Sequence, residues 1–106
     1  MVYVLAKVGN PNIGDSGSYT AIVYLDDKTG KVVEVAGERP RVGACVKVGS
    51  HYARSYQYQD WWRTSLVTEI LEDRPDYMKF RTLNSVYEWR ILGLEEQILG
   101  KKKEQA

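Results

Sequence analysis

Residues 50–64 hold the side chains of this sequence that are best suited to binding chemistry. The segment SHYARSYQYQDWWRT combines three tyrosines and two tryptophans with two arginines and the single histidine of the chain. Single-stranded nucleic acids are commonly bound by this mixture, because aromatic faces stack on bases, worth about 1–3 kcal/mol each, while guanidinium groups contact phosphates. If the chain is extended here, Tyr52, Arg54, Tyr56 and Tyr58 share one face. The segment therefore predicts a stacking surface for nucleic acid.

The charge distribution supports an anionic partner. The whole chain has a net charge of only +1, but residues 39–68 contain five basic residues and a single acidic one, Asp60. Uneven charge of this kind favours a polyanion over a neutral ligand. The predicted nucleic-acid-binding residues are Arg39, Arg41, His51, Tyr52, Arg54, Tyr56, Tyr58, Trp61, Arg63 and Lys79.

The same aromatic residues permit other interpretations. Tyrosine and tryptophan also fill the thin cores of small β folds. Adjacent Trp61 and Trp62 point to opposite faces of a strand, so at most one of them is core, and we expect Trp62 and Trp89 to serve that structural role. Exposed Tyr, Trp and Arg are also the residues enriched at protein interfaces. The alternative function is therefore a protein-interaction module, including a homodimer built on a free sheet edge.

Enzymatic chemistry finds little support in the sequence. The one cysteine, Cys45, stands in an apolar run, where it is expected to be a small buried hydrophobic residue. No second His or Cys completes a zinc site, no acidic spacing matches a calcium loop, and no cofactor motif is present. We therefore predict a non-catalytic protein without metal or cofactor, and an enzyme that uses His51 is the weakest of three hypotheses.

Hydrophobic patterning predicts mainly β-structure. The run over 63–73 fits either a helix or a strand, and its β-branched residues favour a strand. The Gly/Asn/Pro-rich segment 9–17 is expected to be a loop, and EDRPD (72–76) a turn. Further strands are predicted over 2–8, 18–25, 31–36, 41–48, 77–83 and 86–92, with hairpin turns over 26–31 and at 84–85.

These elements indicate a mainly all-β fold of six to seven short strands. A small strongly bent sheet or barrel, SH3-like or OB-like, would bury their apolar faces and limit open edges. We expect a single β domain over 1–100, a short C-terminal helix at most, and a basic flexible tail over 101–106. With one cysteine and no apolar stretch that could span a bilayer, the chain is expected to be cytoplasmic and not bound to membranes.

The spaced pattern WWRTSLVTEI…FRTLNSVYEW, residues 61–70 and 80–89, resembles a motif of small uncharacterised proteins of phages and archaeal viruses. The resemblance implies a small accessory protein in the host cytoplasm, such as a virus-encoded inhibitor or adaptor, and not a metabolic enzyme. It implies no particular site residues.

Overall fold

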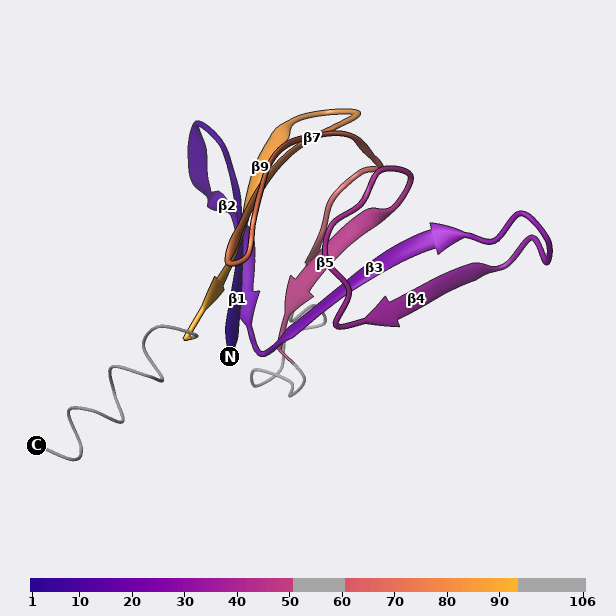
Figure 1. Cartoon of the computed structure of the whole chain (residues 1–106), viewed down its shortest axis with the longest axis horizontal. Coiled ribbons are helices and arrows are strands. Elements are labelled where there is room, and N and C mark those ends of the chain that lie inside the picture. The colour runs from indigo at the N-terminus through magenta and orange to yellow at the C-terminus, as the bar shows by residue number, and fades with distance from the viewer. Residues whose placement is uncertain (51–60, 94–106) are drawn as a thin grey trace, which may run out of the picture.

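The computed structural model describes residues 1–50 and 61–93, which form two antiparallel sheets (Figure 1). The five-stranded sheet has the order β2-β1-β9-β8-β7, and the four-stranded sheet has the order β4-β3-β5-β6. In the first sheet the strands are β1 (Val2–Lys7), β2 (Asn10–Gly17), β7 (Val67–Arg74), β8 (Tyr77–Thr82) and β9 (Val86–Leu92). In the second they are β3 (Tyr19–Leu25), β4 (Val32–Ala36), β5 (Cys45–Gly49) and β6 (Trp61–Arg63).

A single apolar cluster joins the inward faces of the two sheets. Two of its members, Val46 and Val48, come from β5 of the four-stranded sheet. The others come from the five-stranded sheet: Leu5, Val67, Met78, Phe80, Tyr87 and Trp89. One buried polar link crosses this core: the Trp89 indole Nε1 donates a hydrogen bond of 3.1 Å to Thr20 Oγ1. The Thr20 hydroxyl in turn donates to the Lys47 carbonyl at 3.2 Å. Because both polar groups are paired, their burial carries no unsatisfied donor.

The two sheets also meet along their backbones. Val67 N donates to Ala44 O, and Gly43 N donates to Val67 O, both at 2.9 Å, which ties the start of β5 to the start of β7. At another point β2 passes so close to β5 that a Cβ added to Gly17 would lie 2.1 Å from the Gly49 carbonyl oxygen. Glycine at position 17 is therefore a steric requirement of this crossing.

The β3–β4 hairpin extends away from the other labelled strands (Figure 1). Its turn has the predicted chemistry. Asp26 accepts the Lys28 amide on its side chain at 3.0 Å and the Gly30 amide on its carbonyl at 2.8 Å. Gly30 has a φ of +69°, which favours glycine. β3 pairs with β4 on one side and β5 on the other, which agrees with its apolar residues on both faces.

The all-β prediction is confirmed, with several corrections in detail. The strand interpretation of the region after residue 63 is right, since β7 covers 67–74, and the hairpin of β8 and β9 lies where predicted. The turn after β7 is shorter than 72–76, and β5 begins only at Cys45. The predicted loop over 9–17 is wrong, because this segment is strand β2: pairing with β1 satisfies its backbone and overrides the weak strand propensity of its Gly, Asn and Pro residues.

The described strands form two open sheets and no closed barrel, so the SH3-like or OB-like architecture is not confirmed. They number nine, which exceeds the predicted six to seven. The predicted C-terminal helix and basic tail lie outside the described residues.

Candidate nucleic-acid interface

The face of the four-stranded sheet that points away from the core carries an aromatic and basic surface. Cross-strand partners share a face, so the register places Tyr19, Gly49 and Trp61 in one row. The next row contains Ala21, Lys47 and Arg63. We call this surface the outer platform; its polar and aromatic members are Tyr19, Glu34, Lys47, Trp61 and Arg63.

Glycine in the middle of the first row leaves a gap between two rings. Strands lie about 4.8 Å apart, so Tyr19 and Trp61, two strands from each other, are separated by roughly 10 Å at the backbone, with Gly49 between them. A pocket of about 140 Å³ occupies this place, and Tyr19, Glu34, Lys47, Ser50 and Trp61 line it. The pocket therefore follows from the absence of a side chain at position 49.

Glu34 connects the polar groups of the pocket. Its carboxylate accepts hydrogen bonds from the Tyr19 hydroxyl and from Lys47 Nζ, which lies 3.0 Å from Oε1 and 3.3 Å from Oε2. The Lys47 ammonium also lies 4.4 Å from the centroid of the Trp61 ring and 5.8 Å from that of Tyr19. A lysine held between two rings and a carboxylate has a fixed position, which suits it to bind a polar atom of a ligand.

The protonation states of this network follow from its contacts. Burial and the hydrogen bond to Glu34 raise the pKa of Tyr19 to about 12. The hydrogen bond from Tyr19 is the main reason why the pKa of Glu34 is lowered, and the hydrogen bond from Lys47 lowers it further. At neutral pH the phenol is therefore protonated and the carboxylate is charged.

The two tryptophans of β6 separate as strand geometry predicts. Trp61 is half-buried on the outer platform, and Trp62, in register with the buried Val48, lies on the opposite face. Trp62 is nevertheless 38% exposed, because β6 is the edge strand of its sheet, so the prediction that Trp62 belongs to the core is wrong. Trp89 is core, as expected, with 1% exposure. Arg63 is exposed on the platform beside Lys47.

Arg39 lies elsewhere, against the β7–β8 turn. Its guanidinium donates 2.8 Å and 2.6 Å hydrogen bonds to the carbonyls of Pro75 and Arg74, and forms a 2.8 Å ion pair with Asp73. It also lies 5.2 Å from the ring centroid of Trp89. These contacts assign Arg39 to holding the turn against the core.

Arg41 and Lys79 are likewise separated from the platform. The Arg41 guanidinium lies 4.7 Å from the ring centroid of Tyr24. Tyr24 is an odd number of positions from Tyr19 on β3, so it lies on the face opposite the outer platform. Lys79 is on the outward face of the five-stranded sheet, in register with Glu72 and Glu88. The structure thus brings together only Trp61 and Arg63 among the described members of the predicted set.

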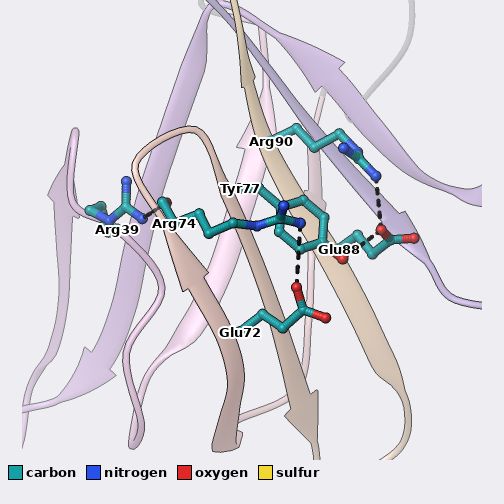
Figure 2. A network of polar contacts seen from close by, with 6 residues as sticks. All are labelled: Arg39, Glu72, Arg74, Tyr77, Glu88 and Arg90. Carbon is teal, nitrogen blue, oxygen red and sulfur yellow. Dashed lines mark hydrogen bonds and ion pairs between the residues drawn. The ribbon is translucent and has the colours of Figure 1, made fainter.

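The outward face of the five-stranded sheet neutralises its own charges. Figure 2 shows Arg74 and Arg90 beside the ring of Tyr77, with their guanidinium carbons 4.5 Å and 4.6 Å from its centroid. Arg74 pairs with Glu72 at 3.3 Å and Arg90 with Glu88 at 2.9 Å, while the Tyr77 hydroxyl donates to Glu88 at 2.7 Å. Burial is the main reason why the pKa of Tyr77 is raised, and the hydrogen bond to Glu88 raises it further. With its arginines paired, this face is less suited to phosphates than the outer platform.

Five predicted residues, His51, Tyr52, Arg54, Tyr56 and Tyr58, lie outside the described residues. The segment 51–60 joins β5 to β6 in the chain, and its flanking residues Ser50 and Trp61 both line the pocket.

Sequence reasoning missed Tyr19, Glu34 and Lys47. The signal for Lys47 was a charged residue inside the apolar strand CVKVG, two positions before a glycine. Tyr19 and Glu34 come from strands distant in sequence, and only the register of β3 with β4 and β5 places them beside Lys47.

The described residues contain no group of three or more His, Cys, Asp or Glu side chains that could hold a metal ion. Cys45 is half-buried on β5, and burial raises the pKa of its thiol despite the opposing effect of Arg63. A raised pKa makes the thiolate scarce at neutral pH, which disfavours a nucleophilic role.

Within residues 1–50 and 61–93, no helix has the length and apolar character needed to cross a membrane. Comparisons with protein-family models, with curated proteins and with solved structures found no match for the chain.

Proposed function

We propose that this chain is a non-catalytic protein that binds single-stranded nucleic acid on the outer platform. The observation that carries the proposal is the placement of two aromatic rings and two basic residues, Lys47 and Arg63, in adjacent rows of one sheet face. Trp61 would stack on a base, and the exposed Arg63 would contact a phosphate. From the sequence alone, the Tyr-rich segment 51–60 between Ser50 and Trp61 is included in the proposed binding residues.

Direct binding to a labelled single strand tests the proposal. We expect fluorescence anisotropy to show binding of a 12-nucleotide strand that weakens as salt increases, because phosphate contacts release counterions. Arg63→Gln should lower the slope of log K against log salt by about 0.7, the contribution of one phosphate contact on a single strand. Arg81→Gln is the matched control, since Arg81 is an exposed strand arginine on the other sheet, 3.5 Å from Glu69.

The adjacent tryptophans provide a second control on the same strand. Trp61→Leu should weaken binding by about 1–3 kcal/mol, the usual value of one stacked base, while Trp62→Leu on the opposite face should leave it unchanged. No binding at low salt by the folded wild-type protein would refute the proposal, as would equal losses for the two variants.

The second candidate function is a protein-interaction module in the form of a homodimer. This candidate is favoured because β4 is an edge strand of its sheet. It is also favoured by Leu25 and Val32, cross-strand partners near the tip of the β3–β4 hairpin, which are 60% and 70% exposed. A second β4 would continue the sheet at this free edge, next to Val32. Light scattering should then report a dimer for the wild type and a monomer for Val32→Lys, and a wild-type monomer at high concentration would refute this candidate.

A small SH3-like or OB-like architecture and a phage or viral origin remain part of the proposal. The first is supported by the two places where the sheets meet, at Ala44 with Val67 and at Gly17 with Gly49. The second is supported by the sequence resemblance of residues 61–70 and 80–89 alone.

A further inference from the structure

The pocket of the outer platform has the size of one six-membered ring. Its volume of about 140 Å³ is close to that of the roughly 150 Å³ protein cavity known to accept benzene. The rings of Tyr19 and Trp61 flank the pocket together with the Lys47 ammonium, which lies 5.8 Å and 4.4 Å from their centroids, so a flat group would enter beside this ammonium. These dimensions fit a pyrimidine base better than a bicyclic purine.

The polar groups of the pocket include one acceptor with unused capacity. A carboxylate offers about four lone-pair positions. Glu34 Oε2 accepts hydrogen bonds from the Tyr19 hydroxyl and from Lys47. Within the described residues, Oε1 accepts one hydrogen bond, from Lys47 at 3.0 Å. Oε1 can therefore accept one further hydrogen bond from a ligand.

Lys47 presents a donor beside that acceptor. Its ammonium has three protons, and its two contacts with Glu34 leave at least one for another acceptor. The pocket thus offers an acceptor and a donor next to each other, flanked by aromatic rings.

We infer that this pocket binds one pyrimidine base and prefers cytosine to uracil, with Glu34 as the specificity-determining residue; the inference rests on the proposed nucleic-acid binding. Cytosine presents its 4-amino donor next to the N3 acceptor, which matches Glu34 beside Lys47. Uracil has a carbonyl oxygen at position 4, and its N3–H lies between two carbonyl oxygens. A carboxylate that accepts this proton therefore approaches at least one oxygen that repels it.

The experiment compares 5′-labelled (dC)10 and (dU)10 at pH 8, where cytosine is unprotonated. Both strands have the same backbone, and neither carries the thymine methyl group. We expect the wild type to bind (dC)10 about five- to tenfold more tightly, the lower part of the range for discrimination by one base contact. Glu34→Gln should bring the ratio close to one, because an amide can both donate and accept.

Glu69→Gln is the matched control, since Glu69 is an exposed strand carboxylate paired with Arg81 on the other sheet. It should keep the wild-type ratio, and thermal unfolding verifies that both variants are folded. Equal binding of the two strands by the wild type, or a ratio that Glu34→Gln leaves unchanged, would overturn the base preference while the proposed function stands. Absence of binding to either strand would overturn both.

Discussion

Replacing Arg39 by methionine tests whether this arginine stabilises the fold or binds a ligand. Methionine keeps an unbranched apolar chain over Trp89 and removes the guanidinium that contacts Pro75, Arg74 and Asp73. The released carbonyls belong to an exposed turn, so water replaces the lost donors. We therefore expect a measurable but not disabling loss of stability.

The magnitude follows from the individual contacts. Charged hydrogen bonds contribute about 1.5–3 kcal/mol when buried, but the Arg39 side chain is 39% exposed and Asp73 is 62% exposed, so solvent reduces each contribution. An exposed cation–π contact adds about 0.5–1 kcal/mol. We expect a total of about 2 kcal/mol, which corresponds to roughly 8–16 °C in the melting temperature of a protein of this size.

Urea denaturation followed by tryptophan fluorescence measures this loss, with Arg81→Met as the control for removing an exposed arginine. The control should change the free energy of unfolding by less than about 1 kcal/mol, since its single ion pair is at the surface. Equal stability of the two variants, combined with weaker nucleic-acid binding by Arg39→Met, would show that Arg39 binds nucleic acid and does not stabilise the turn.

Three further predictions concern the crossing of the sheets, the core and the pocket. Gly17→Ala should lower the free energy of unfolding by about 2–3 kcal/mol, because its Cβ would lie 2.1 Å from Gly49 O, whereas Gly37→Ala, with a φ of +80° and nothing within 4 Å, should cost only about 1–2 kcal/mol; similar urea midpoints would refute this. Thr20→Val should cost about 1–3 kcal/mol in the same assay, because the buried Trp89 indole then loses its acceptor, and an unchanged midpoint would contradict the assigned hydrogen bond. The hydrogen bond from Tyr19 lowers the pKa of Glu34 below its ordinary 4.5, so its stabilising contribution is present above that pH and is lost as the pH falls through the folded-state pKa. The stability difference between the wild type and Glu34→Gln should therefore shrink on acidification below about pH 4.5, and a difference that grows in acid would show the sign to be wrong.

Local patterns predicted the β3–β4 and β8–β9 hairpins well because the turn of such a hairpin is decided by neighbouring residues. Asp26 and Gly30 form the β3–β4 turn by contacts within five residues, and the alternation in 77–83 and 86–92 decides the faces of β8 and β9. Strand β2 escaped prediction because its residues are poor strand formers on their own, and only pairing with β1 makes an extended conformation favourable there.

The candidate site was predictable only in part, for the same physical reason. Trp61 and Arg63 could be identified from two-residue alternation within one strand. Their partners Tyr19 and Lys47 are separated from them by at least 14 positions in the sequence, and the backbone register alone makes them neighbours. The contacts of Arg39 with the β7–β8 turn could not be predicted, because the composition of a basic segment does not reveal which of its charged side chains contact a distant turn.

The distribution of the three tryptophans has a practical consequence for spectroscopy. Trp61, Trp62 and Trp89 occupy the outer platform, the opposite face of the edge strand and the core, so each indole experiences a different environment. Labelling with 5-fluorotryptophan would give three ¹⁹F resonances, of which Trp61 is expected to respond to ligand, Trp62 to solvent conditions and Trp89 to loss of sheet packing. Occupancy of the platform and unfolding of the molecule could thus be followed separately in one sample, without any attached dye.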